Sequence, residues 1–304
     1  REKLDTSGNK TTPTYFEYIF YIAIVYFSRS NVDYVILETG MGGRLDVTNI
    51  FNDSLSIITS IGMDHMQYLG NSIRDIAFEK AGIIKHNSTV IFDDSNEEAN
   101  DVIINMAKEK NAKLIRLSEF DYERLDFTFV KYKKKAAALA ILGAGQLLKG
   151  IGYIDEAIRN TIWHGRMEEI EKDIIIDGAH NEPAMLEFIE NVINIAKVRN
   201  KKIKLLLSLV KDKEMEKIFD ILVSGLDVKK YYLTSVNSYR TNIISDLYNS
   251  LNILLEKNKR QAEIACYNSS KEAFDKAREE KSDDELLFCT GSLYLIGEIL
   301  EENR

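Results

Sequence analysis

The sequence has few cysteines and no long apolar run. Only Cys266 and Cys289 occur among its 304 residues, and their spacing is not that of metal ligands, which favours a reducing compartment. No apolar run approaches the ~18 residues that a membrane span requires, and no signal-peptide pattern is found. We therefore expect a cytoplasmic protein with no membrane partner.

An excess of positive charge is also lacking. Lysine and arginine number 40 against 48 acidic residues, which gives a net charge of −8. This balance argues against nucleic acid or an anionic membrane surface as the main partner. An anionic substrate would need lysine, arginine or a metal ion placed locally at its site.

Two well-known phosphate-binding motifs are missing as well. Residues 8–11, GNKT, resemble the tail of a P-loop but lack its first glycine, the preceding strand and the following helix. The GMGGRLD stretch has three glycines, but their spacing is not that of a GxGxxG dinucleotide fingerprint. Neither stretch by itself identifies a nucleotide site.

The pattern of apolar residues predicts an α/β fold in two domains. The length exceeds the roughly 250 residues typical of one core, and short apolar strands alternate with amphipathic helices. This alternation predicts mainly parallel sheets covered by helices. We place the boundary at the Trp163–Arg166 hinge and expect domains at 1–163 and 164–304. Strands are expected at 34–37, 55–60, 88–92, 112–117, 173–177, 202–210, 230–235 and 285–292. Helices are expected at 14–30 (buried), 71–84, 96–110, 136–148, 154–162, 182–198, 214–222, 242–257, 270–280 and 293–301.

Residues 38–85 carry the strongest chemical signals of the first domain. Glu38 follows one apolar run, and Asp64 and His65 follow the next. Ligands sit at the carboxyl ends of strands in open α/β sheets, so these side chains suit a divalent metal beside phosphate. The alternatives are two buried strands with ordinary polar loops, and a histidine that belongs to the core.

Lys80 lies within AFEKAGIIK, next to residues with little side-chain bulk. A desolvated lysine has a lowered pKa, and its free amine can take up carbon dioxide to form a carbamate, which is an anionic oxygen ligand. The alternative is a solvated helix lysine.

The second domain offers the sequence IIIDGAHNEP, in which a strand ends directly before a helix start. Helix starts attract anions, and Asp177 could hold a ribose hydroxyl or an ammonium group. Arg166 at the hinge places a guanidinium where it could grip a phosphate. The alternative is a capping turn, because Asn181 is a typical N-cap residue.

Taken together, ETGMGGRLDVTN, SIGMDHMQYLG, FEKAGIIK, HGRMEE, DGAHN and FCTGSLYLIGE resemble the folylpolyglutamate synthase/dihydrofolate synthase family of the Mur ligase superfamily. The resemblance implies an N-terminal P-loop-type ATPase domain and a smaller Rossmann-like domain, with the active site between them. It also implies an ATP-dependent ligase that uses ATP and Mg²⁺, with two ions expected. Its small-molecule substrates would be dihydropteroate or folate, and L-glutamate, and the enzyme would be a monomer.

The resemblance also implies roles for individual residues. The magnesium ligands would be Glu38, His65 and a carbamylated Lys80, which are also the catalytic residues. The residues that hold ATP would be Arg166, Asp177, His180 and Asn181. The residues that contact the other substrates would be Thr14, Phe16 and Asp46 for pteroate and Ser292 for glutamate.

Two family features are missing from the sequence. These are the GTNGKGS phosphate loop and a polar motif before the helix at 136–148. Because the sequence starts at Arg1 rather than Met, we expect the phosphate loop to lie before it. Because KYKKK abuts AAALAILGAG with no turn residues between them, we expect the polar motif on an interior loop that is missing there. Two alternatives stay open: a Mur-type ligase that acts on another carboxylate, and a nucleotide-binding pseudoenzyme.

Overall fold

The computed structural model describes residues 12–302, apart from 53, 64–65, 151, 212–214 and 240. The chain divides into two compact units. Unit 1 is Arg1–Asp121 with Ala138–Gly150, and unit 2 is Tyr122–Ala137 with Ile151–Arg304. Helix α5 (Lys131–Leu147) therefore belongs partly to each unit. None of the helices in the described ranges is long and apolar enough to span a membrane.

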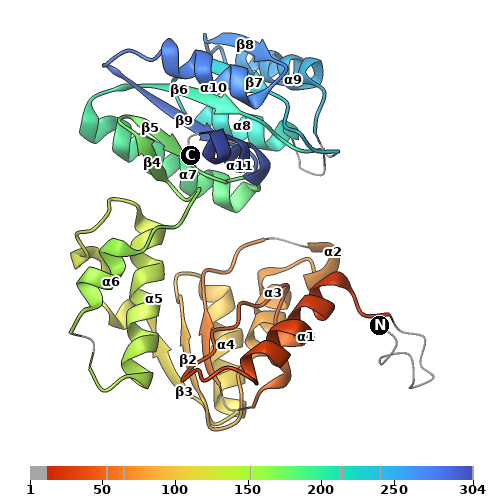
Figure 1. The fold of residues 1–304 in the computed structure, drawn as a ribbon, viewed down its shortest axis with the longest axis vertical. Coiled ribbons are helices and arrows are strands. Elements are labelled where there is room, and N and C mark those ends of the chain that lie inside the picture. Colours follow the sequence, from red (N-terminus) through yellow and green to blue (C-terminus); the bar gives the residue numbers. More distant parts are fainter. Residues whose placement is uncertain are drawn as a thin grey trace. The chain divides into compact units, whose positions relative to one another are not determined.

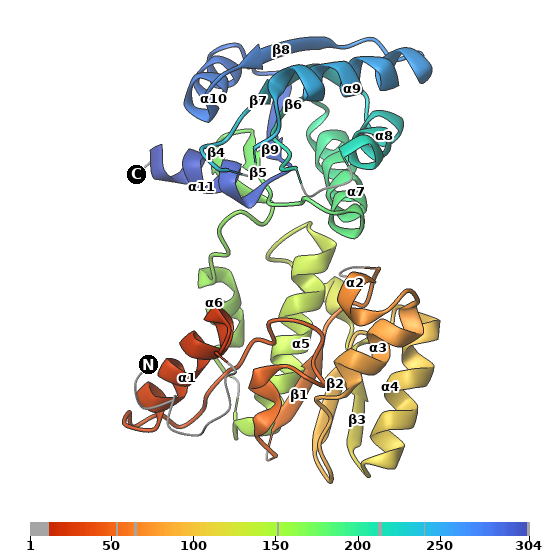
Figure 2. The ribbon, with the colours of Figure 1, turned by 90° about the vertical axis from the view of Figure 1, so that its right-hand side faces the viewer.

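Unit 1 is built on three parallel strands in the order β1-β2-β3 (Figure 1). These are β1 (Leu55–Ile58), β2 (Thr89–Phe92) and β3 (Lys113–Arg116). Helices α3 (Ile73–Ala81) and α4 (Glu97–Glu109) lie side by side, and their buried side chains form one core with those of the sheet (Figure 2). Gly143 of α5 packs against Ile57 on the opposite face of β1. The sheet is thus covered on both faces, as the sequence predicts.

Two predictions for unit 1 are wrong. Residues 34–37 form no strand, and Ile36 is 95% exposed. Helix α1 (Tyr15–Phe27) exists, but Phe20 is its only buried residue, although we predicted a buried helix. Apolar composition indicates that a segment gains from burial. It does not identify the strand or surface that would provide the burial.

Unit 2 contains a six-stranded sheet in the order β4-β5-β9-β6-β7-β8, in which only β4 is antiparallel. Its strands are β4 (Glu168–Glu171), β5 (Ile174–Ile176), β6 (Lys202–Leu207), β7 (Val228–Thr234), β8 (Glu263–Tyr267) and β9 (Glu285–Thr290). Its larger helices are α7 (Glu182–Arg199), α8 (Met215–Gly225), α9 (Ile244–Lys257), α10 (Ser270–Glu279) and α11 (Leu293–Glu302). The remaining elements in the described ranges are short: α2 (Met66–Leu69), α6 (Ile154–Asn160), η2 (Val47–Ile50), η3 (Leu117–Glu119) and η4 (Tyr122–Arg124).

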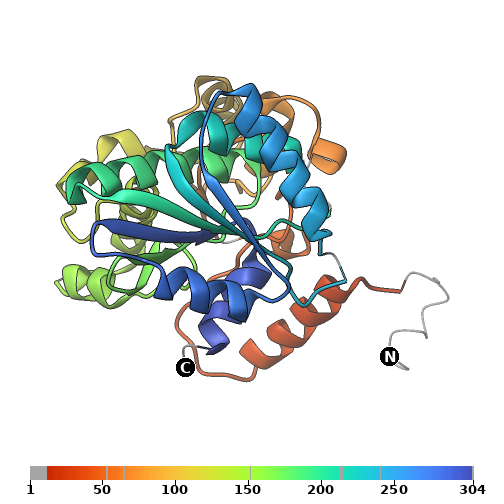
Figure 3. The same cartoon turned by 90° about the horizontal axis from the view of Figure 1, so that it is seen from above.

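The helices of unit 2 cover opposite faces of its sheet (Figure 3). Side chains of α7, α8 and α9 share one apolar core, and those of α10 and α11 share another. Consequently, β5 leads into α7 on one face, whereas its neighbour β9 leads into α11 on the other. The carboxyl ends of β5 and β9 therefore form a switch point, which is where α/β folds bind ligands.

Three features of this part of the chain were not predicted. Strands β4 and β8 lie at the two edges of the sheet, where charged residues and short length weaken the apolar alternation. Helix α5 begins at Lys131 rather than at residue 136, because the KYKKK segment continues the helix without a turn. Lysine is a good helix former even where no apolar stripe marks the helix.

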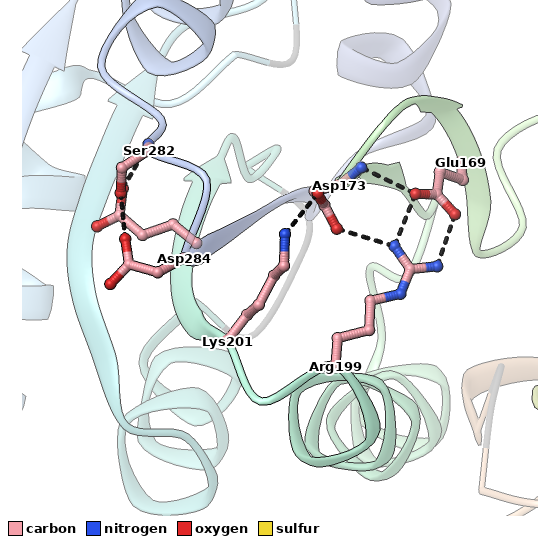
Figure 4. A network of polar contacts seen from close by, with 7 residues as sticks. Glu169, Asp173, Arg199, Lys201, Ser282 and Asp284 are labelled. Carbon is pink, nitrogen blue, oxygen red and sulfur yellow. Dashed lines mark hydrogen bonds and ion pairs between the residues drawn. The ribbon is translucent and has the colours of Figure 1, made fainter.

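A network of charged side chains fixes the turn between β4 and β5 (Figure 4). Asp173 lies in this turn with a positive φ of 64° and is buried. Its carboxylate accepts hydrogen bonds from Lys201 at 2.7 Å and from Arg199 at 3.1 Å, and Arg199 also forms a bidentate pair with Glu169. The network ties the β4–β5 hairpin to the C-terminal end of α7.

We expect Asp173→Asn to lower the free energy of unfolding by about 3 kcal/mol, because it leaves two cations without their buried partner. Burial alone would raise the pKa of Asp173, but the bonds from Lys201 and Arg199 outweigh it and hold the pKa below its ordinary value. A depressed pKa contributes stability above the unfolded-state pKa of about 4, and this is lost as the pH falls. Urea denaturation between pH 3 and 7 checks both expectations.

The matched control is Asp284→Asn, which removes an exposed ion pair with Lys202 in the same unit. Exposed pairs contribute little, so stability near pH 7 should barely change. Equal losses in both variants would show that the burial of Asp173 has no energetic importance.

Candidate functional site

The GMGGRLD loop of unit 1 packs on the C-terminal end of α3. Arg44 forms a bidentate pair with Glu79, and its backbone N–H donates to the Glu79 carbonyl at 2.7 Å. A side chain at Gly43 would lie 2.8 Å from that carbonyl oxygen, and one at Gly82 would lie 2.3 Å from Cβ of Arg44. The close approach therefore requires glycine on both segments. It fixes the loop against the turn of α3 that carries Lys80.

Asp46 holds the same loop from within. One carboxylate oxygen accepts from the Met41 N–H at 2.9 Å, and the other accepts from the Thr48 N–H and hydroxyl. The ring of Phe16 lies against Gly40, where an added Cβ would come within 2.7 Å of it. Thr14 caps α1 through a capping box with Glu17. The structure thus brings Phe16 to the loop that Asp46 orders.

The proposed magnesium ligands are described only in part. Glu38 is exposed and Lys80 is partly exposed, whereas His65 and the neighbouring Asp64 lie outside the described residues. Within the described ranges, no group of three His, Cys, Asp or Glu side chains could hold a metal ion. The carboxylate of Glu38 is a hard oxygen donor of the kind that Mg²⁺ prefers, so its chemistry fits the predicted ion. The three-ligand site stays a prediction.

Asp177 is the centre of the polar contacts at the carboxyl end of β5. Its Oδ1 accepts from the Ala179 N–H, and its Oδ2 accepts from the Met167 N–H, both at 2.8 Å. The hydroxyl of Tyr132 donates to Oδ2 at 3.0 Å. Burial outweighs these three donors and raises the pKa of Asp177 above its ordinary value, although the donors and the nearby Arg166 favour the charged form. The side chain is only 5% exposed, so any ligand would reach it from one side.

The hinge loop packs directly against this strand end. The guanidinium of Arg166 lies 5.9 Å from the Trp163 ring, and a side chain at Gly178 would come within 2.8 Å of its Nη1. Met167 has a φ of +41°, which is unusual for a bulky residue. Its N–H bond to Asp177 helps to hold this conformation. Arg166 and Asp177 therefore lie close together, and their role in holding ATP stays a prediction.

His180, Asn181 and Ser292 all lie at this edge and all make local contacts. Nδ1 of His180 lies 2.7 Å from the Gly178 carbonyl oxygen, which assigns the ring proton to Nδ1. Asn181 caps α7 by accepting from the Ala184 N–H at 3.1 Å, and Ser292 accepts from the N–H of Tyr294. The capping alternative is thus correct for Asn181.

Sequence reasoning missed two residues of this site, Tyr132 and Lys133. Both lie in the first turn of α5, and Nζ of Lys133 donates to the Met167 carbonyl at 3.3 Å. Burial lowers the pKa of Lys133, although Asp177 and Glu168 act in the opposite direction. No motif marks these residues. The only signal was a tyrosine set among lysines directly before an alanine-rich helix.

Two α/β units with a ligand-binding switch point in the second sheet fit the architecture of ATP-dependent ligases of the Mur type. A family model described as "Mur ligase middle domain" matches residues 2–148, and one described as "Dihydrofolate synthetase, C-terminal domain" matches residues 161–302. The chain belongs to the dihydrofolate synthase/folylpolyglutamate synthase family. This confirms the predicted family and the predicted class of enzyme.

Relatives and solved structures agree with this assignment. The dihydrofolate synthase/folylpolyglutamate synthase of Bacillus subtilis is 33% identical over 94% of this chain and 71% of its own length. That of Escherichia coli is 28% identical over 98% of this chain and 72% of its own length. The structure of E. coli FolC in complex with DHPP and ADP has a TM-score of 0.81 at 26% identity, and the match covers 97% of this chain and 72% of that one. The predicted fold class is thereby confirmed.

A further structure, from Yersinia pestis, is complexed with AMPPNP and a Mn ion. It has a TM-score of 0.79 and is 22% identical, with the match covering 99% of this chain and 73% of that one. At this identity the likeness supports the fold. The ATP analogue and the divalent metal in that structure are the two kinds of cofactor that the sequence predicts.

Proposed function

We propose that this chain uses ATP to join the carboxylate of dihydropteroate, of folate, or of both to the amine of L-glutamate. The observation that carries the proposal is the B. subtilis relative, which aligns with 94% of the chain and is named for both activities. The proposal is also supported by the sequence, which contains both the GMGGRLD loop and the DGAHN strand end, two of the motifs that carry the resemblance to this family. Neither alternative, another Mur-type ligase or a pseudoenzyme, is favoured by a relative named here.

The reaction requires activation because a carboxylate is a poor acylating agent. The carboxylate oxygen attacks the γ-phosphorus of ATP, which breaks the bond to ADP and gives an acyl phosphate. The glutamate amine then attacks the acyl carbon, loses a proton and displaces inorganic phosphate, so that an amide forms. Cationic groups are needed while negative charge moves between these oxygens.

For residues 1–163 we propose the binding of magnesium, ATP phosphates and the pteroate or folate. Glu38, His65 and Lys80 would hold the ion, which when bound would neutralise phosphate charge. The ordered loop around Asp46, with the Phe16 ring against it and Thr14 at the start of α1, would line the acceptor pocket. Phe16 is 44% exposed, which leaves ring surface for an aromatic pterin to stack on.

For residues 164–304 we propose the binding of the nucleotide and of glutamate. Arg166 would pair with a phosphate, and Asp177 would accept from a ribose hydroxyl through the acceptor position that its three donors leave free. His180 and Asn181 would line the same edge. Ser292, at the start of α11, would lie near glutamate, whose carboxylates suit a helix N-terminus.

We also propose a cytoplasmic monomer. The sequence supports a reducing compartment through its two free cysteines, one of which, Cys289, is fully buried in β9. Size-exclusion chromatography with light scattering checks the monomer. A stable dimer at micromolar concentration would contradict it.

The function is tested by incubating the full-length protein with ATP, Mg²⁺, L-glutamate and either dihydropteroate or tetrahydrofolate. We expect phosphate release that depends on both glutamate and an acceptor, together with a product one glutamate heavier by mass spectrometry. A panel of other carboxylates provides the control. The absence of acceptor-dependent phosphate release with both pterins would contradict the proposal.

A further inference from the structure

The first turn of α5 reaches into the site at the end of β5. Tyr132 packs against the larger core of unit 2, to which Val130 also belongs, and its hydroxyl lies 3.0 Å from Oδ2 of Asp177. This turn belongs to unit 2, whereas the later residues of the same helix belong to unit 1. A residue that is 45 positions away in sequence thus contacts the carboxylate proposed to bind the nucleotide.

The Asp177 carboxylate accepts fewer hydrogen bonds than it has lone pairs to accept with. An ionised carboxylate offers about four lone-pair positions. Oδ2 accepts from the Met167 N–H and the Tyr132 hydroxyl, and Oδ1 accepts from the Ala179 N–H. One position, on Oδ1, remains for a ligand hydroxyl. The donors on Oδ2 fix the plane of the carboxylate and hence the direction of that position.

We propose that Tyr132 is a positioning residue for nucleotide binding, because its hydroxyl orients Asp177 so that Oδ1 meets a sugar hydroxyl. This inference rests on the proposed function, in which Asp177 binds the nucleotide. Tyr132 acts through Asp177 and need not touch the ligand. Its aromatic ring supplies packing, and its hydroxyl supplies orientation.

The charged groups around this contact favour hydrogen bonding over proton transfer. Burial and the nearby Asp177 raise the pKa of Tyr132 far above its ordinary value, so the hydroxyl keeps its proton and remains a donor. Arg166 acts in the opposite direction, and Glu187 adds to the rise. Lys133, from the same turn, donates to the Met167 carbonyl at 3.3 Å, so both backbone polar groups of Met167 are held at this site.

The test is calorimetric titration of ADP with Mg²⁺ into the full chain, as wild type, Tyr132→Phe, Asp177→Asn and the double variant. We expect Tyr132→Phe to weaken ADP binding by about threefold to tenfold, since a hydrogen bond to a charged group is lost while the ring stays. The double variant should bind no more weakly than Asp177→Asn alone, because the tyrosine acts through that carboxylate. In turnover, KM for ATP should rise with little change in kcat.

The matched control is Tyr232→Phe, which removes a tyrosine–carboxylate bond of 2.7 Å to Glu280 at the C-terminal end of α10. It should leave ADP binding unchanged, and thermal unfolding should confirm that all variants are folded. If Asp177→Asn weakens binding but Tyr132→Phe binds ADP as well as or better than wild type, the positioning role of Tyr132 is wrong. The proposed nucleotide role of Asp177 then still stands. Additive losses in the double variant would also overturn the positioning role of Tyr132. If Asp177→Asn binds like wild type, the proposed nucleotide role of Asp177 fails, and the inference fails with it.

Discussion

Replacing Lys80 with alanine should remove nearly all ligase activity, with a loss of about 1,000-fold, while the protein stays folded. Lys80 lies near the C-terminal end of α3, on the turn that the GMGGRLD loop contacts, and its side chain is only partly exposed. In the proposed function it carries an anionic group that helps to hold a cation at the phosphates. Loss of such electrostatic stabilisation typically raises the free energy of the transition state by several kcal/mol. Acceptor-dependent phosphate release gives the rate, and circular dichroism gives the folded state.

Two further variants decide how Lys80 acts. Lys80→Arg keeps a positive charge but cannot form a carbamate, so we expect it to be as inactive as Lys80→Ala. Lys110→Ala is the matched control. Lys110 pairs with Glu109 at the end of α4, so we expect this variant enzyme to turn over at the wild-type rate. Normal turnover of Lys80→Ala would show that Lys80 is a surface cation. Full activity of Lys80→Arg would exclude the carbamate.

The candidate site could be predicted wherever residues adjacent in sequence form it. Asp177 directly follows the apolar strand β5, and ligand-binding residues concentrate at such positions in α/β folds. Tyr132 could not be predicted in this way, because it meets its partner Asp177 only through the packing of the first turn of α5 within unit 2. A contact between residues 45 positions apart leaves no local pattern.

The fold likewise could be predicted where nearby residues determine an element, and it could not be predicted where residues distant in sequence determine it. The capped helices α3 and α4 begin within two residues of the predicted positions, because Ser72 and Asn96 mark their starts. The sequence did not predict the edge strands β4 and β8, and it wrongly predicted a strand at 34–37. A strand is defined by the strands it pairs with, which the local sequence does not show. Residues 34–37 are apolar enough for a strand, but they pair with none of β1, β2 or β3.

Helix α1 illustrates the limit for burial. Its sequence is almost entirely apolar, yet Tyr15 is 83% exposed and Tyr26 is 67% exposed. A helix that is apolar all round normally has neighbours on every side. Among the residues of α1, only Phe20 is buried, and the Phe16 ring lies against Gly40. The sequence therefore predicts the helix correctly but gives its environment wrongly.

Replacing Glu38 with alanine should lower the ligase rate by on the order of 100-fold and raise the Mg²⁺ concentration needed for half-maximal activity. Glu38 lies just before the ordered loop of residues 40–46 and is exposed, so its carboxylate is accessible to an ion. An exposed side chain contributes little to the core, and we therefore expect thermal stability to stay near that of wild type. Initial rates at increasing Mg²⁺ concentration, with ATP held constant, measure both quantities.

The matched control for Glu38 is Asp33→Ala, which removes another exposed carboxylate from the same segment. Its rate and Mg²⁺ dependence should equal those of wild type. Glu38→Gln keeps the size of the side chain but binds Mg²⁺ poorly, since a neutral amide oxygen is a weaker ligand than a carboxylate. If Glu38→Gln is impaired as strongly as Glu38→Ala, and both recover in part at high Mg²⁺, the carboxylate acts through the metal. An unchanged Mg²⁺ requirement in both variants would remove Glu38 from the metal site.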